Sequence, residues 1–406
     1  MISVRREGWL LSLAAFLVVT LVRPALAHAY VWMIRYGDAT CTSCHTDPSG
    51  SSILTAQGRS RGDLLMRTRY QPSDYQLAGE RHEEPSKLAD FAWGGGDLPE
   101  EIRLGADLRG GFFAMKPADH ALDKRFLLMR ADLFGDIKLW RVRAAGSIGY
   151  ADTGALGAAL TRQAAHNLVS REHWLGLELD EDATWLVRAG RIALPFGLRT
   201  PEHTLWVRSL TRTDIDDDQQ YGAALAVSRG IVRAEVMGIL GNYQIKPDDY
   251  RERGYSAYIE VAPIPKFAAG LSGLFTRARR DLIYRVTDYR HAYGVFARYA
   301  PLEPLIFLAE ADWLYESVTW NGNRSGYAAF LQSDWEMGRG IHFMLTGETK
   351  NNGTLNERPS FGGWVSGQWF FAPHADIRID NIFQTIKTSV TRQDVFSLLV
   401  QLHVYL

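Results

Sequence analysis

The sequence lacks most of the features that enzymes and soluble secreted proteins rely on. It contains only 2 cysteines, so neither a disulfide network nor a second cysteine pair for a zinc site can form. Its formal net charge is -1, which gives no support for binding to nucleic acid. After residue 29 no stretch approaches the roughly 18 consecutive apolar residues of a membrane-spanning helix. No nucleotide-binding loop, dinucleotide fingerprint or Ser/His/Asp set stands in a supporting context.

The two cysteines stand three positions apart in Cys41-Thr42-Ser43-Cys44-His45, the C-x-x-C-H pattern of covalent haem attachment. Two thiols at this spacing can add to the two vinyl groups of one porphyrin, and the adjacent His45 then supplies the proximal iron ligand. A redox dithiol or half of a zinc site would share the C-x-x-C part. His45 and the absence of further cysteines favour haem, so we predict one covalent haem c on Cys41 and Cys44.

The sixth ligand of the iron would set its redox potential, because methionine raises the potential relative to histidine. Met66 lies downstream at a suitable distance and Met33 lies just upstream, so we name Met66 or Met33 as the distal ligand. His28 and His82 are the histidine alternatives. An ordinary apolar role for Met66, or an open iron site, remains an alternative.

Residues 1–29 have the pattern of an export signal. Arg5 and Arg6 precede an apolar stretch, and the small-residue motifs Ala25-Leu26-Ala27 and Ala27-His28-Ala29 follow it. The apolar stretch is shorter than the roughly 20 residues of a membrane anchor, so we expect cleavage. Export agrees with haem c, which is attached outside the cytoplasm.

From residue 102 onward apolar and polar residues alternate with period two, as in β-strands. Leu127, Met129 and Ala131 share one strand face, and Arg130 and Asp132 share the other. The same alternation recurs at 102–109, 305–315 and 375–380. A soluble β-sandwich and a membrane barrel would both show it, so connection lengths must decide between them.

Those connections alternate between tight turns and long polar loops at 152–170, 195–217, 242–253 and 350–359. Short periplasmic turns opposite long outer loops are typical of outer-membrane barrels. We therefore predict that residues 101–406 form an all-β transmembrane antiparallel barrel of about sixteen strands. The expected turns are Gly135-Asp136, Asp180-Glu181-Asp182, Ser228-Arg229-Gly230, Pro263-Ile264-Pro265, Pro301-Leu302-Glu303-Pro304, Gly338-Arg339-Gly340 and Pro373-His374. Aromatic residues near strand ends suggest interfacial girdles, namely Trp140, Trp174, Trp185, Tyr299, Trp313, Trp335, Trp364 and Trp369.

A single haem motif followed at once by such a barrel resembles the fused monohaem cytochrome–porins of bacterial outer membranes, best known from their iron-oxidising branch. Arg35-Tyr36-Gly37 before the cysteines is similar to the stretch that precedes them in that branch, although the gap to Cys41 is one residue longer here. Arg188-Ala189-Gly190-Arg191, leading into Pro195-Phe196-Gly197, is similar to a strand-and-loop segment of anion-type porins.

We expect residues 30–100 to form a short cytochrome c-like segment that uses the barrel wall as its missing core, with a flexible periplasmic tail as the alternative. The favoured function is an outer-membrane electron carrier between an extracellular donor or acceptor, such as a metal ion, and a periplasmic cytochrome or other redox protein. A ferrous-iron oxidase is the enzymatic version of this function. The alternative from another class is a passive diffusion porin with a structural or sensory haem, its lumen lined by charges of both signs. The expected surroundings are the lipid bilayer and lipopolysaccharide.

Overall fold

A computed structural model describes residues 31–36, 41–48, 50, 53–62, 66, 68, 98–99, 101–118, 120–151, 167–202, 204–215, 218–242, 252–281, 284–319, 322–354 and 357–406. The expected export signal, His28 and His82 lie outside the described residues. Among the residues described, no helix has the length and the hydropathy needed to cross a membrane.

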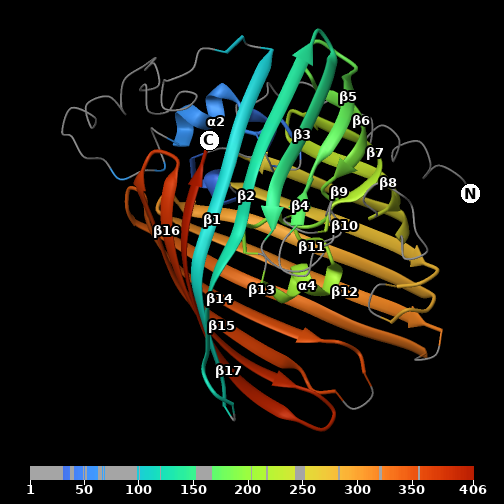
Figure 1. The fold of residues 1–406 in the computed structure, drawn as a ribbon, viewed down its shortest axis with the longest axis vertical. Coiled ribbons are helices and arrows are strands. Elements are labelled where there is room, and N and C mark those ends of the chain that lie inside the picture. Colours follow the sequence, from blue (N-terminus) through green and yellow to red (C-terminus); the bar gives the residue numbers. More distant parts are fainter. Residues whose placement is uncertain are drawn as a thin grey trace, which may run out of the picture.

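The chain forms one antiparallel sheet that closes on itself, because the first strand pairs with both the second and the last (Figure 1). Closure leaves no unpaired sheet edge. The strands are β1 Ile102–Pro117, β2 Asp123–Leu139, β3 Val142–Ala151, β4 Asn167–Val169, β5 His173–Glu178, β6 Trp185–Ile192, β7 Gln220–Arg229, β8 Val232–Gly241, β9 Glu252–Ile264, β10 Phe267–Ala278, β11 Asp288–Leu302, β12 Leu305–Val318, β13 Gly322–Gly338, β14 Ile341–Asn351, β15 Ser360–Ala372, β16 Ala375–Lys387 and β17 Arg392–Tyr405.

The strand β3 pairs with two short strands in succession. Its residues Val142 to Gly146 face β5, and Gly149 to Ala151 face β4. The two short strands therefore act as one interrupted strand. Counted in this way, the barrel has 16 strands, which confirms the predicted number.

The predicted long connections lie at one end of the barrel and the predicted tight turns at the other, although the connections from β12 to β13 and from β16 to β17 at the long-loop end are also short. The turns that join β5 to β6, β7 to β8, β9 to β10, β11 to β12, β13 to β14 and β15 to β16 fall at the expected sequences. One prediction was wrong, because Gly135-Asp136 lies inside β2 and the turn is formed by Trp140 and Arg141. Gly135-Asp136 has the sequence of a turn dipeptide. However, the Asp136 side chain is fully buried on the inner face and forms ion pairs with Arg103 and Arg143. β3 consequently begins at Val142 and not near residue 137.

The outer face of the barrel is apolar and the inner face carries the charges. Leu133, Leu271 and Leu331 are more than half exposed on the outside, whereas the adjacent Asp132 and Gln332 are buried. An apolar outer surface around a polar interior is the reverse of the arrangement in a soluble protein. It matches the arrangement in a barrel that is surrounded by lipid. The girdle prediction was wrong for two tryptophans: Trp174 and Trp364 are buried against interior residues.

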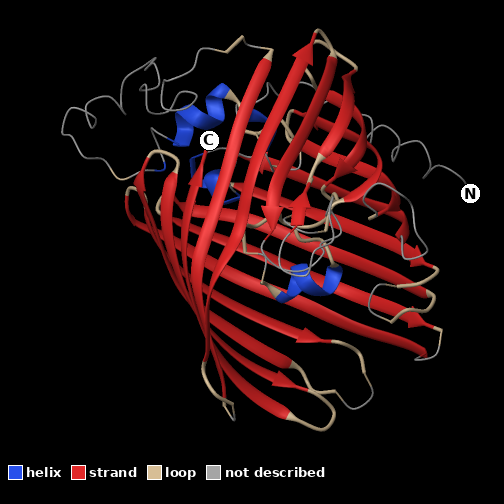
Figure 2. Cartoon of the chain, viewed as in Figure 1, coloured by secondary structure: helices blue, strands red, loops and turns tan. Residues whose placement is uncertain are grey.

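The connection between β6 and β7 does not extend outward as the sequence suggested. Its residues Leu198, Leu205 and Val207 are buried, and its helix α4, Trp206–Thr211, contacts β12, β13 and β14 across the barrel interior (Figure 2). The Glu310 carboxylate on β12 accepts a hydrogen bond from the Leu198 amide at 2.8 Å and pairs with Arg208. The sequence does carry a signal for this inward fold, namely a run of apolar residues within a loop that was expected to face solvent. Burial of apolar side chains stabilises the folded protein.

Candidate functional site

The C-x-x-C-H motif forms a compact turn against the inner face of the barrel. Cys41 begins a short 3₁₀ turn, η2 (Cys41–Ser43), and its carbonyl oxygen accepts hydrogen bonds from the amides of Cys44 at 3.2 Å and His45 at 2.9 Å. Both cysteines are buried and free of disulfides. The turn holds both thiols and the imidazole in one local unit.

The segment that follows the motif folds back on it. His45 forms an isolated antiparallel bridge with Leu54, and the amide of Thr55 donates to the carbonyl of Cys44 at 2.8 Å. Thr55 then caps the helix α2, Ala56–Arg61, by accepting from the amide of Gly58 at 3.1 Å. Because of this cap the helix begins at residue 56.

A cavity of about 930 Å³, open solvent included, adjoins the motif. Cys44 and His45 line it together with Met33 and Met66, so both methionines named from the sequence face the same space as His45. Met33 and Met66 are 1% and 5% exposed. Burial alone therefore does not show which of the two methionines is the distal iron ligand.

The remaining wall of this cavity comes from the barrel and its inward-folded loop. Sequence reasoning missed Arg199 and the role of the loop in this wall, because only the closed barrel brings residues so distant in the chain together. The strand alternation predicts that Arg130 faces the lumen, but not that it lies beside the motif. The wall residues are Ala106, Asp107, Arg109, Arg130, Phe134, Arg199, Pro201, Ile215, His403, Tyr405 and Leu406.

The first described residues, η1 (Val31–Tyr36), are fixed to the barrel wall by a buried arginine. Arg35 is fully buried and pairs with Asp334 at 2.6 Å and Glu336 at 3.3 Å, both on β13. The Tyr36 hydroxyl donates to Glu336 at 2.5 Å. Burial, reinforced by the negative charge of Glu336, raises the pKa of Tyr36 well above its ordinary value, so this hydroxyl stays protonated.

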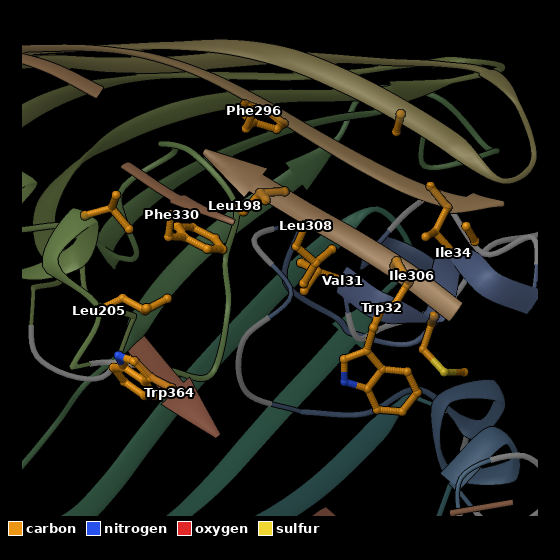
Figure 3. Close-up of a cluster of buried hydrophobic side chains, with 14 of the residues drawn as sticks. Val31, Trp32, Ile34, Leu198, Leu205, Phe296, Ile306, Leu308, Phe330 and Trp364 are labelled. Atoms are coloured by element: carbon orange, nitrogen blue, oxygen red, sulfur yellow. The ribbon is translucent and has the colours of Figure 1, made fainter. Parts of the chain in front are cut away.

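Apolar packing complements these ion pairs. Val31 and Trp32 join a cluster with the inward-facing barrel residues Ile306 and Leu308 (Figure 3). The Trp32 ring lies 4.7 Å from that of His342 and 6.0 Å from that of Phe370, measured between ring centroids. In the same cluster Leu198 and Leu205 come from the β6–β7 connection, so the N-terminal segment and that loop share one core inside the barrel.

The residues around the motif have the chemistry that a covalent haem c requires. The buried thiol of Cys44, the adjacent imidazole of His45 and two methionine sulfurs border one cavity, and the second buried thiol, Cys41, belongs to the same turn. Thioether-forming and iron-binding groups are what such a cofactor uses. Gly50 supports the same fit: it has φ of +79°, and a Cβ placed there would lie 3.0 Å from the sulfur of Cys41. A larger residue would therefore crowd the thiol.

The interior charges predicted to line the lumen do so, in mixed-sign networks. Arg130 pairs with Asp107 at 3.3 Å and Asp132 at 2.6 Å. Arg378 pairs with Asp380 at 2.9 Å and with Glu202 of the inward loop at 2.7 Å. These pairs fix the loop to the wall, because an unpaired buried charge is costly.

No family model and no curated protein matches the chain. Solved structures do match its fold. An anion-selective porin from Comamonas acidovorans aligns over 75% of this chain and 99% of its own, with TM-score 0.57 and 11% identity. The outer membrane channel DcaP of Acinetobacter baumannii covers 75% and 97%, with TM-score 0.55 and 12% identity. OmpT of Vibrio cholerae covers 76% and 99%, with TM-score 0.54 and 10% identity.

At such low identity the likeness concerns the fold alone, and the resemblance to fused cytochrome–porins stays a prediction. The closed 16-stranded sheet, its apolar outer face and its charged interior agree with these porin structures. The chain is a porin-like outer-membrane β-barrel.

Proposed function

We propose that this barrel is an outer-membrane channel for small polar solutes that carries one haem c on Cys41 and Cys44. The observation that supports a channel is a pair of adjoining interior cavities. The cavity beside His45 and a second one of about 470 Å³ have Arg109, Pro201 and His403 in common as lining residues. The second cavity extends along β15, β16 and β17 past the inward loop, with Gln368, Arg378 and Gln401 in its wall. Charges of both signs on this route suit anions or mixed solutes.

In this proposal Cys41 and Cys44 hold the haem, His45 binds its iron, and Met33 or Met66 is the second ligand. When bound, the haem supplies one-electron chemistry at a potential set by that second ligand. The barrel residues position the N-terminal segment: Arg35 fixes it to β13, and the apolar cluster around Trp32 excludes water from it.

The haem part of the proposal is tested by mass spectrometry and haem staining of the protein purified from outer membranes. We expect the added mass of one haem on the intact polypeptide, and its loss in the Cys41→Ser, Cys44→Ser double variant. Replacement of Met33 or Met66 by Leu in separate variants should shift the absorption spectrum only when the true ligand is removed. An unmodified polypeptide mass would overturn this part.

The channel part is tested by conductance in planar bilayers. Purified protein should show steady single-channel currents in potassium chloride, and Gln401→Trp, which narrows the second cavity, should reduce them. The matched control is Gln393→Trp at the outer end of the same strand. A barrel that passes no current would contradict the channel.

A second candidate, electron relay across the membrane, is favoured by how much of the interior is filled. The N-terminal segment and the β6–β7 connection share one apolar core within the barrel, which leaves less room for solutes than a single inward loop would. The chain would then exchange electrons between an extracellular donor or acceptor, such as Fe²⁺, and a periplasmic cytochrome, in a bilayer rimmed by lipopolysaccharide. A membrane about 25 Å thick is wide for one redox centre, so partners would have to approach from both sides.

Liposomes separate the two candidates. Protein reconstituted in vesicles loaded with an electron acceptor should reduce it from an external donor if the relay exists. The Cys41→Ser, Cys44→Ser protein must then lose the transfer while keeping any ionic conductance. Equal transfer by both proteins would exclude the relay.

A further inference from the structure

Three basic residues stand side by side across three neighbouring strands of the inner wall. In the strand register Arg109 of β1 is directly opposite Arg130 of β2 on one side and His403 of β17 on the other. Like charges placed opposite each other in a sheet are destabilising. A row of this kind therefore needs carboxylates nearby.

The carboxylates of the wall form ion pairs with the two flanking residues and not with the central one. Arg130 pairs with Asp107 and Asp132, and His403 contacts Asp107 at 3.3 Å and Asp376 at 3.0 Å. Among the residues that the structure describes, the Arg109 side chain has no ion pair and no hydrogen bond. Asp107, the acidic residue nearest to it in sequence, is engaged on both sides by its other neighbours.

The strand opposite Arg109 is irregular at this point. Arg109 is opposite Arg130 and Gly110 is opposite Leu128, so Met129 of β2 is the extra residue of a bulge beside Arg109. Bulges are frequent beside functional sites. Arg109 lines both the cavity next to His45 and the second cavity, so its guanidinium stands at the boundary between them.

The cavity next to His45 has an excess of basic side chains. Three arginines, Arg109, Arg130 and Arg199, line it, whereas Asp107 is its single carboxylate side chain among the described residues. Arg199 lies 3.6 Å from Glu235, which Arg188 also engages at 2.6 Å. A guanidinium without a partner in such a space is suited to a planar carboxylate, which it can bind through two hydrogen bonds.

We propose that Arg109 binds a carboxylate at the boundary between the two interior cavities. The inference rests on the proposed function, because two sources of this group are then available. One is a propionate of the haem held by Cys41 and Cys44. The other is a free carboxylate solute that passes through the channel. Arg109 is a ligand-binding residue in either case.

Carboxylate binding is measured first in full-length protein with Cys41→Ala and Cys44→Ala, which cannot hold the haem covalently. Calorimetric titration with sodium acetate, against sodium chloride of equal ionic strength, requires neither conductance nor redox activity. We expect Arg109→Gln to raise the Kd for acetate about tenfold, because one charge-assisted pair is lost. Arg109→Lys should retain part of the affinity, which shows that the variant barrel folds and that charge matters.

The control is Arg103→Gln. Arg103 lies on the same strand and pairs with Asp136, which Arg143 also engages, and it lines neither cavity. This variant should bind acetate like the parent protein. Equal acetate affinity in the Arg109→Gln, Arg103→Gln and parent proteins would overturn the proposal.

The protein with intact cysteines identifies the source of the carboxylate. If it is a propionate, acetate should no longer bind, and Arg109→Gln should lower the midpoint potential, because a carboxylate without its cation stabilises the oxidised iron. If it is a free solute, acetate should still bind through Arg109 and the potential should stay unchanged. Loss of the haem or of conductance in the parent protein would refute the proposed function, while the acetate titration would still decide the role of Arg109.

Discussion

Asp47, two residues after His45, forms an ion pair with Arg188 of β6 in which both side chains are fully buried. Arg188 also pairs with Glu235 at 2.6 Å, so the N-terminal segment is joined to the barrel wall through a shared arginine. A buried ion pair contributes little beyond a well-packed apolar contact, but removal of one partner is costly. The pair therefore fixes where the motif stands more than it adds to overall stability.

Asp47→Asn should loosen the N-terminal segment without unfolding the barrel. Glu235 still compensates Arg188, so we expect the loss of about one charged hydrogen bond, roughly 1.5–3 kcal/mol. Limited proteolysis with mass spectrometry should show faster cleavage between residues 31 and 62, while the strands stay intact. Asp394→Asn, which removes an ion pair whose side chains are 65% and 54% exposed, is the control and should leave cleavage unchanged.

Arg35→Gln should widen the interior. The substitution leaves Asp334 and Glu336 without their buried cation, so η1 should detach from β13. We expect larger single-channel currents in planar bilayers than in the parent protein. Arg125→Gln, at an ion pair whose side chains are 54% and 50% exposed, should leave the current unchanged. An identical conductance for Arg35→Gln would mean that η1 does not narrow the pore.

Leu271→Arg tests which face of the barrel meets lipid. Leu271 is 57% exposed near the middle of β10, whereas the neighbouring Ser272 is buried inside. A cation on the lipid face at mid-membrane depth costs about 2–4 kcal/mol. Reversible unfolding in urea in the presence of lipid vesicles should show this loss, and Leu271→Met should unfold like the parent protein. An unchanged free energy of unfolding for Leu271→Arg would contradict the assigned orientation.

Tyr36 should make the docking of the N-terminal segment sensitive to alkali. Burial and Glu336 raise the pKa of Tyr36 in the folded protein, so its contribution is complete below the unfolded value of about 10 and declines as pH rises above it. Proteolysis of the segment with a protease active in alkali should therefore accelerate between about pH 10 and 11. In the Tyr36→Phe variant the rate of proteolysis should not rise in this pH range. A rise equal to that of the parent protein would mean that another group causes it.

Much of the fold was predictable because strand alternation and turn chemistry are local. The period-two pattern at 305–315 predicted that Glu310 and Asp312 face inward, and both are buried there. Local signals also produced the error at Gly135-Asp136, since a turn dipeptide is indistinguishable in sequence from a glycine beside a buried aspartate. Only the cross-strand ion pairs of Asp136 reveal its position.

The sequence by itself determined the barrel, its strand number to within the predicted range, and the presence of a C-x-x-C-H motif, because each depends on residues close together in the chain. The tertiary structure alone decided what surrounds the motif. Arg109, Arg199 and His403 meet beside it because the sheet closes on itself and one long loop folds inward. No local pattern encodes either event, since both are stabilised by contacts between residues that are distant in sequence.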